Sequence, residues 1–472
     1  MNIRTLLSSL LLTFISIFSI NAQSDYETAW ELLLKNDRVA AKEKFTAAAR
    51  NSSTKADAFL SLSLIDWIND DNESGFANFK NAYEAMPSPY AALYAVSSLP
   101  FMNKYSNYQS PEKVAFYENV LKDAKLNGTL RATICALLAE HYRFVKNDKK
   151  ANEYIAQLGV IDKWQVLGSF DNTSGSGFAK DWGAIEKTQT TDVFKNKSNA
   201  DVHWYAPSAI RFDKWIDFNL YFTLNNTVNF AQSFVKSPVN QEVYLRVGTS
   251  GSLKAWLNDA LVAEVVEERN CDLDLYGYKV TLQKGANRIL VQIGQSEIDR
   301  SNFMLRFTDE NSNPVKGLEQ SAEYVEYAKA GVKGIPELLP FYPEEEIRKH
   351  IDENPQNPLY KILLAQTYLR NDKAFEATSL LKSLEETYQN STLISNSLLE
   401  AYLRSKNNTD HTRELESIKK NDPESYPAMQ LFYSEALEQE RYDEALEILE
   451  QIIGVYGENS FTENAQITLA SY

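Results

Sequence analysis

The sequence predicts a multidomain α and β fold, in which an α-solenoid of helical hairpins flanks a central antiparallel β-sandwich. Two observations carry this prediction: a 34-residue period near both ends of the chain, and alternating apolar and polar residues between them. With 472 residues, 44 % of them hydrophobic, the chain is long enough for about three domains with separate cores.

The first residues predict export. Arg4 precedes an apolar stretch from Leu6 to Ile20, which is shorter than the roughly 20 residues needed to span a bilayer. The small residue Ala22 stands where a signal peptidase cuts, so we predict a signal peptide over residues 1–22. A retained anchor is the alternative, but no later segment is apolar enough for a second span. We therefore expect an exported bacterial protein that is either periplasmic or located at the cell surface or outside the cell. After cleavage of the signal peptide, we expect no transmembrane segment.

Charge and cysteine content exclude several function classes. The net charge of −16 opposes binding to the phosphate backbone of nucleic acids or to anionic lipid. Cys135 and Cys271 fall in different predicted domains and belong to no metal-ligand spacing, so we expect neither a disulfide between them nor a metal or cofactor.

The C-terminal third carries the clearest repeat. Residues of matching type recur every 34 positions, as in Ala377, His411 and Ala445, and in Leu381, Leu415 and Leu449. Paired helices need small residues where they cross closely, so the middle repeat should pack more loosely at His411. Pro423 stands where a unit must end. These positions resemble tetratricopeptide repeats, and we assign residues 346–472 to such an array.

The same period is fainter near the N-terminus. Three positions agree across two units: Ala41, Phe45 and Ala48, followed after 34 residues by Gly75, Phe79 and Ala82. We expect three to four hairpins in a domain over residues 23–160, also similar to tetratricopeptide repeats. An unrelated helical bundle is the alternative for either array.

Resemblance to the tetratricopeptide family implies a concave groove, lined by the first helix of each pair, that receives a peptide or partner helix. Family positions facing that groove include Gln366, Asn396, Glu400 and Gln430. Glu400 is the charged residue among them. Binding of a peptide's terminal carboxylate requires Lys or Arg at such positions, so we do not expect this mode of binding. The alternative is that this surface only holds neighbouring domains.

Between these arrays, residues 161–318 alternate as half-buried strands do, and residues 319–345 read as a linker. Strand-like runs are separated by turn residues, with no helix long enough for a crossover. Three sequence segments resemble those of galactose-binding-like jelly-roll domains: Trp164 to Phe170, Val247 to Asn258, and Leu282 to Val291. Many relatives carry acidic residues in the turn before the Trp strand. Here Thr249 and Ser250 stand there, so calcium is not expected.

Tryptophans in this central region are candidates for a sugar-binding face, because an exposed indole can stack on a sugar ring. Trp164, Trp215 and Trp256 lie in alternating strands and are expected in the core. Trp182 and Trp204 occupy loop-like stretches. Together with His203 they form the predicted ligand face.

No catalytic motif is found. The four histidines have no zinc-binding spacing, and Gly248 to Gly251 does not form a nucleophile elbow. Cys135 sits in an apolar helix, where a thiol is inert. A concealed catalytic site would gather His203 with Asp201 or Asp181.

The combined architecture resembles the N-terminal half of exported bacterial transglutaminase-like proteins. No residue matches their catalytic region, although the resemblance leaves room for such a region after Tyr472 in a longer gene product. We therefore expect a non-catalytic binding or scaffolding protein with a protein or peptide partner. The alternative is a carbohydrate-binding protein that acts through the β-sandwich.

Overall fold

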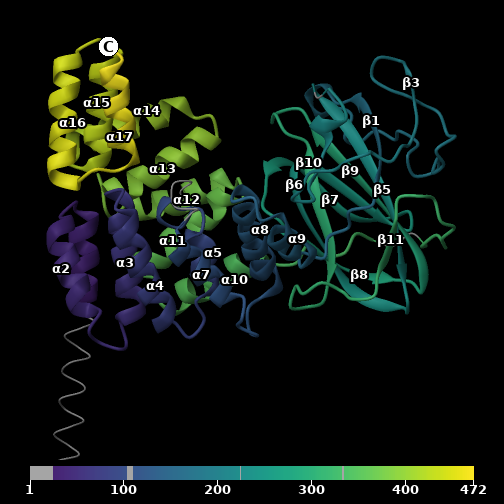
Figure 1. Ribbon diagram of the computed structural model, residues 1–472, viewed down its shortest axis with the longest axis horizontal. Coiled ribbons are helices and arrows are strands. Elements are labelled where there is room, and N and C mark those ends of the chain that lie inside the picture. Colours follow the sequence, from purple (N-terminus) through teal and green to yellow (C-terminus); the bar gives the residue numbers. More distant parts are fainter. Residues whose placement is uncertain (1–24, 104–109, 224, 332–333) are drawn as a thin grey trace, which may run out of the picture. The chain divides into compact units, whose positions relative to one another are not determined.

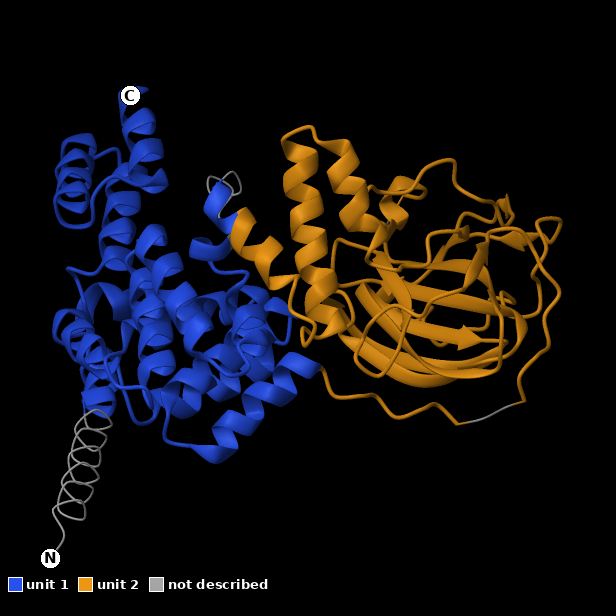
Figure 2. Ribbon diagram, turned by 60° about the horizontal axis from the view of Figure 1, so that its bottom comes forward, with its two compact units in different colours: residues 1–113, 342–472 blue, residues 114–341 orange. Residues whose placement is uncertain are grey.

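The computed structural model describes residues 25–103, 110–223, 225–331 and 334–472, so the predicted signal peptide lies outside the described residues (Figure 1). The chain divides into two compact units (Figure 2). One contains the described residues up to 113 together with 342–472, and we call it the helical unit. The other contains residues 114–341 and is called the sheet unit. This mixed architecture, helices plus a large curled antiparallel sheet, confirms the predicted combination of α and β parts.

The helical unit is built from short helices joined by tight turns. After a helical stretch at residues 25–34, its helices are α2 (Arg38–Ala48), α3 (Lys55–Ile68), α4 (Asn72–Ala85), α5 (Tyr90–Val96), α6 (Pro100–Asn103), α10 (Tyr342–Glu353), α11 (Pro358–Arg370), α12 (Ala374–Glu385), α13 (Thr392–Arg404), α14 (Asn408–Asn421), α15 (Tyr426–Glu438), α16 (Tyr442–Tyr456) and α17 (Ser460–Ala470). Asx side chains cap many N-termini: Asp71, for example, accepts from the Ser74 amide at 3.0 Å. None of the described helices is both long and apolar enough to cross a bilayer.

Small residues stand where neighbouring helices pack closely. Ala377 and Ala445 have no exposed surface, whereas His411, at the equivalent position of the middle repeat, is half-buried. The imidazole is too large to be enclosed in the space that an alanine methyl fills.

Helices from both ends of the chain share the helical unit. The Tyr26 hydroxyl donates to Asn357 at 3.1 Å, and the Thr392 amide donates to Asn36 at 2.8 Å. Arg38 forms an ion pair with Asp422. These regions were predicted as two separate arrays. Hydrogen bonds between residues more than 300 positions apart leave no local pattern in the sequence, so their association was not predicted.

The sheet unit contains a nine-stranded sheet whose pairings are all antiparallel. Its strands are β1 (Gln165–Asp171), β4 (Ile216–Asp217), β5 (Thr227–Ser237), β6 (Gln241–Leu257), β7 (Ala260–Asn270), β8 (Tyr276–Leu282), β9 (Gly285–Gln295), β10 (Asn302–Thr308) and β11 (Glu319–Ser321). The order is β1-β5-β9-β6-β10-β4, with β11 on β5 and both β7 and β8 on β6. A separate two-stranded ribbon joins β2 (Phe194–Lys195) to β3 (Asp201–Val202).

Strand β6 explains why the sheet curls. Its first half pairs with β8 and β10, and its second half pairs with β7 and β9. The turn predicted at Thr249 to Ser252 is therefore wrong, because these residues lie inside β6. The local irregularity there is a bulge at Gly251, whose φ of +122° lies in a region that residues with a Cβ rarely adopt.

Three helices also belong to the sheet unit, at least in part: α7 (Pro111–Val120), which spans the boundary, α8 (Gly128–Phe144) and α9 (Asp148–Ala156). Apolar residues of α8 and α9, including Cys135 and Ile155, cluster with Leu273 and Met304 of the sheet region. Gly128 lies so close to Ser312 that a Cβ would approach its backbone to 2.1 Å. The unit boundary therefore falls at residue 113 and not at the predicted 160.

The segment predicted as a linker is largely attached to the sheet. Strand β11 pairs with β5, the Tyr327 hydroxyl donates to Asp259 at 2.9 Å, and Leu338 bridges to Tyr278. Each contact is to a residue distant in sequence, so the polar composition of residues 319–345 did not reveal it.

Candidate binding sites

A cleft of about 710 Å³ opens on the sheet unit. Three segments line it: the end of β1, the β2–β3 ribbon with its turn, and a loop that precedes β5. The lining residues are Gly168, Ser169, Asn196, Lys197, Ser198, Asp201, Val202, His203, Tyr205, Tyr221, Phe222, Thr223 and Asn225. Such a volume suits a small ligand or a short polymer segment.

The ribbon turn is held by Asn196. Its side-chain oxygen accepts from the amides of Ser198 and Ala200, both at 2.9 Å, which closes the turn locally. The Lys197 amide donates to the Ser169 carbonyl at 2.9 Å, and its ammonium group binds the Asn225 carbonyl. These bonds join all three lining segments, so the polar side of the cleft is formed before any ligand arrives.

Three aromatic rings, those of Tyr205, Tyr221 and Phe222, also line the cleft. Tyr205 and Tyr221 each meet Phe222 edge to face, with ring centroids 6.4 Å apart in both pairs. Tyr205 is 41 % exposed, so part of its ring remains accessible. Burial raises the pKa of both tyrosines above the ordinary value.

Of the residues in the hypothesis of a concealed catalytic site, His203 and Asp201 line this cleft and Asp181 does not. Asp201 pairs with Lys195 at 2.6 Å, and that hydrogen bond lowers the pKa of the carboxyl group. His203 is exposed, and its Nδ1 lies 2.9 Å from the Asp192 carbonyl. Asp201 therefore stays ionised at neutral pH and is poorly suited to act as a general acid.

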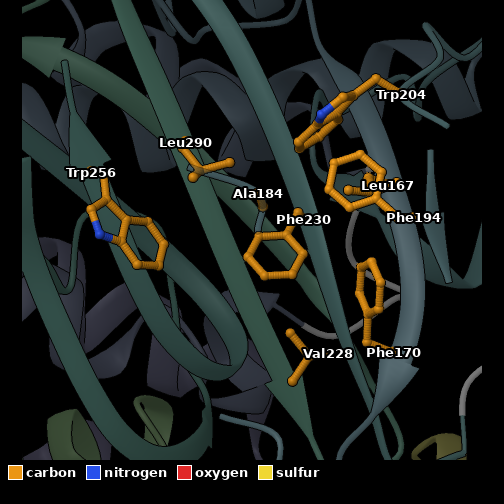
Figure 3. Close-up of a cluster of buried hydrophobic side chains, with 9 residues drawn as sticks. All are labelled: Leu167, Phe170, Ala184, Phe194, Trp204, Val228, Phe230, Trp256 and Leu290. Atoms are coloured by element: carbon orange, nitrogen blue, oxygen red, sulfur yellow. The ribbon is translucent and has the colours of Figure 1, made fainter. Parts of the chain in front are cut away.

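The predicted stacking role of Trp204 is wrong. Its side chain is 1 % exposed, and its indole Nε1 donates to the Lys187 carbonyl at 2.9 Å. Figure 3 shows it in the hydrophobic core beside Phe194 and Leu167. Trp182 is half-buried against Phe170, with ring centroids 4.8 Å apart. Neither indole lines the cleft. The rings that do line it belong to Tyr205, Tyr221 and Phe222, which were not predicted from the sequence.

The helical unit has a cavity of about 400 Å³. Its lining combines residues of α13, α15, α17, the end of α3 and the turn that follows α3: Trp67, Ile68, Asp70, Asn396, Tyr426, Pro427, Gln430, Ser460, Phe461 and Asn464. Two of the four predicted groove residues, Asn396 and Gln430, therefore meet in one site. The contributions of Trp67 and Asp70 were missed, because their repeat is the fainter one.

The other two predicted groove residues lie elsewhere. Gln366 is 6 % exposed, and its amide donates to the Ser397 hydroxyl at 3.3 Å between α11 and α13. Glu400 is exposed and pairs with Arg404 one turn later at 2.7 Å. Gln366 thus acts within the packing of the helices, and Glu400 stands outside the cavity.

A second hollow of the helical unit, of about 710 Å³, lies among α10, α11 and α12. Its most exposed apolar side chain is Phe375, at 79 %. Leu364 and Leu380 also line it, and Arg348 stands at its edge with its guanidinium bound to the Tyr368 hydroxyl.

Among the described residues, no group of three or more His, Cys, Asp or Glu side chains is placed to hold a metal ion. Cys135 has no exposed surface, and burial raises the pKa of its thiol to about 11, so it stays protonated. Cys135 and Cys271 are not joined by a disulfide, as expected.

Comparison with known proteins gives no family assignment: no family model, no curated protein and no solved structure matches this chain. The class that the fold defines is a two-unit protein with a helical part and a curled antiparallel sheet.

Proposed function

We propose that this chain is an exported, non-catalytic binding or scaffolding protein whose helical unit docks a protein or peptide partner. The supporting observation is the cavity in which Asn396 and Gln430 meet. Both are positions that the resemblance to tetratricopeptide repeats places on a groove, and they lie on different helices, α13 and α15.

This proposal includes a tetratricopeptide-like solenoid and a galactose-binding-like jelly roll, as in the N-terminal half of transglutaminase-like proteins. Burial of Ala377 and Ala445 at equivalent repeat positions supports the solenoid, since close helix crossings require small residues there. The antiparallel pairing of the curled sheet is compatible with the jelly roll.

The cavity chemistry suits a peptide. An amide side chain both donates and accepts, so Asn396, Gln430 and Asn464 can pair with the N–H and C=O groups of a peptide backbone. Trp67 and Phe461 offer apolar surface for one of its side chains.

The test is an array of short peptides probed with labelled protein from residue 23 onward. We expect a subset of peptides to bind, and Asn396→Ala with Gln430→Ala to weaken binding about tenfold through lost hydrogen bonds. Phe375→Ser is the matched control, because it alters the α10–α12 hollow only. Loss of binding in the control but not in the double variant would move the docking site to that hollow and contradict the proposal.

A second candidate function is carbohydrate binding in the sheet-unit cleft. The observation that favours it is that rings, Tyr205 and Phe222, and polar residues, Asn196 and Lys197, line the same cleft. A sugar has an apolar C–H face and a rim of hydroxyls, and a lining with both kinds of group complements both.

A glycan array separates this candidate from the first. If Tyr205→Ala lowers the binding of glycans at least about tenfold, carbohydrate binding in this cleft is supported. His203→Ala tests for concealed catalysis at the same cleft. Loss of turnover of a bound glycan or ester, with folding retained, would refute the non-catalytic proposal, whereas weaker binding without turnover would agree with it.

A further inference from the structure

The sheet-unit cleft is lined by two charged side chains and a histidine. Among the described residues of the lining, these are Lys197, Asp201 and His203, and the remainder are neutral. Asp201 pairs with Lys195 across the β2–β3 ribbon at 2.6 Å, so its negative charge is matched by a cation beside it. The ligand chemistry of the cleft therefore depends on what Lys197 and His203 can still bind.

Lys197 keeps its positive charge at the cleft. Its ammonium group donates to the Asn225 carbonyl, a neutral acceptor that does not compensate the charge. An ammonium group has three N–H donors, so two remain for a ligand. The Lys197 amide donates to the Ser169 carbonyl at 2.9 Å, which fixes the backbone from which the side chain extends. A negatively charged ligand group is the partner that suits this position.

His203 supplies the opposite kind of group. A backbone carbonyl only accepts hydrogen bonds, so the 2.9 Å contact between the His203 Nδ1 and the Asp192 carbonyl assigns the ring hydrogen to Nδ1. In the neutral imidazole, Nε2 is then an acceptor. Because His203 is exposed at the cleft, Nε2 can accept a hydrogen bond from a ligand hydroxyl.

The aromatic rings add apolar surface to these two polar groups. Tyr205 and Phe222 line the cleft, and Tyr205 is 41 % exposed, so its ring can contact the C–H groups of a sugar. The cleft thus offers a cation, an acceptor for a hydroxyl and apolar surface. A neutral sugar would leave the ammonium charge unused, and an acid without hydroxyls would leave the imidazole acceptor unused.

We propose that this cleft binds an acidic sugar, a uronic acid residue of a glycan, whose carboxylate pairs with Lys197 while a hydroxyl donates to His203. The inference rests on the second candidate function, carbohydrate binding, and names the ligand class of the same site. A hydrogen bond between an ammonium group and a carboxylate is about twice as strong as one between neutral groups. The net charge of −16 opposes anionic ligands at long range, so the preference for an acidic sugar comes from this contact.

Lys197→Met is the variant that removes the charge. Lys197 is exposed, so folding should be retained with the loss of the bond to Asn225. Lys197→Arg is the conservative variant, because it keeps a positive charge and several donors. Lys284→Met is the matched control, since Lys284 is an exposed lysine of the sheet unit outside the cleft.

The experiment compares tetramers of galacturonic, glucuronic and mannuronic acid with their methyl esters by isothermal titration calorimetry. Each ester keeps the sugar rings and the ring hydroxyls but has no charge. We expect at least one acid to bind about tenfold more tightly than its ester. Lys197→Met should abolish this difference, whereas Lys197→Arg and Lys284→Met should preserve it. His203→Ala should weaken acid and ester alike, because it removes the hydroxyl acceptor and not the cation.

Tetraglutamate separates recognition of a sugar from recognition of charge. It carries carboxylates without sugar rings, and we expect it to bind at least about tenfold more weakly than the preferred acid. Tetraglutamate that binds as tightly as the acids would overturn the inference, because charge alone would then be recognised. A loss in His203→Ala that is confined to the acid would overturn the assigned contact with a hydroxyl.

The remaining outcomes distinguish the inference from the function on which it rests. Equal binding of every acid and its ester, or a preference that survives Lys197→Met, would overturn the acidic-sugar assignment while carbohydrate binding stands. If neither the acids, nor their esters, nor the neutral glycans of the array bind the unaltered protein, the inference and carbohydrate binding both fail.

Discussion

The hydroxyl of Tyr360, at the start of α11, donates a 2.7 Å hydrogen bond to the carboxylate of Asp57 on α3. The Asn357 amide reaches the same carboxylate at 3.3 Å. Burial raises the pKa of Asp57, because the charged carboxylate has lost solvating water that these two donors replace only in part. This contact ties the N-terminal helices to the C-terminal repeats inside the helical unit.

Tyr360→Phe should destabilise the helical unit by about 1–3 kcal/mol, because it removes a hydrogen bond to a charged group that stays buried. Urea denaturation followed by far-UV circular dichroism measures the change. Tyr472→Phe is the control, since Tyr472 is 72 % exposed and should lose little. Equal midpoints for the two variants would show that the Tyr360–Asp57 bond does not stabilise the fold.

Asp57 also predicts a pH dependence. Its pKa is raised in the folded state, so the folded protein holds the proton more tightly than the unfolded chain does. Its contribution to stability is therefore fully present below the unfolded value of about 4 and is lost as pH rises through the folded pKa. Asp57→Asn cannot ionise, so the variant should gain stability relative to the unaltered protein between about pH 4 and pH 7.

Denaturation midpoints at several pH values in that range test this expectation. Asp66, whose pKa burial also raises, is present in both proteins and cancels in the comparison. A stability difference between variant and unaltered protein that stays constant with pH would contradict it.

Local patterns predicted the elements of this fold, and distant contacts decided their assembly. The period of 34 located Ala377 and Ala445 in buried positions, and alternation predicted strands in the central region, although it divided β6 with a turn that the structure does not have. In contrast, α8 and α9 are tied to the sheet by Arg306, which donates to the Gly128 and Leu158 carbonyls, and no periodicity reveals these contacts.

The candidate sites were predicted in part for the same reason. Asn396 and Gln430 follow from the repeat register, but Asp70 joins them through Tyr426, 356 residues away. Trp204 was misassigned because β2 and β3 are only two residues long, too short to show the alternation of a buried ribbon. Tryptophans were the predicted residues for stacking on a sugar ring, so the role of Tyr205 in the cleft was not predicted.

Ala445→Leu should destabilise the last repeats by about 1–3 kcal/mol through overpacking. Ala445 is fully buried between Tyr433, Leu449 and Ala465, so three added carbons have no space. Thermal unfolding measures the effect. Glu447→Leu adds an apolar side chain on the same helix at an exposed position and should change stability by less than about 0.5 kcal/mol. An unchanged melting curve for Ala445→Leu would show that the repeat register is wrong.

Removal of divalent metal should leave the unfolding of the sheet unit unchanged. Thr249 and Ser250 are buried in β6, where the Thr249 hydroxyl donates to the Asn302 carbonyl at 2.9 Å. The Ser250 amide donates to the Asn302 side chain at 3.1 Å, and among the described residues no group of three or more His, Cys, Asp or Glu side chains could hold a hard cation. Melting curves with and without EDTA make the comparison. A lower melting temperature in EDTA that calcium restores would refute this expectation.

Arg306→Met should be the most damaging of these substitutions to the sheet unit. Arg306 on β10 is 1 % exposed, and it holds Asp274 through its Nε at 2.8 Å and through a second guanidinium nitrogen. The same guanidinium donates to the Gly128 and Leu158 carbonyls, both at 3.1 Å, at the start of α8 and just after α9. Without it, Asp274 remains as a buried, poorly compensated charge, which costs about 3–5 kcal/mol.

Because that side chain also fastens α8 and α9 to the sheet, the variant should expose residues 128–156 to protease before the strands unfold. Urea denaturation and limited proteolysis measure the two effects. Lys236→Met is the matched control, since Lys236 pairs with Glu319 at 3.4 Å on the surface and should lose no more than about 1 kcal/mol. Adding Asp274→Leu to Arg306→Met should recover part of the stability, because the double change leaves no buried charge. If the double variant is as unstable as Arg306→Met alone, the penalty does not come from the unpaired carboxylate, and the carbonyls at Gly128 and Leu158 account for it.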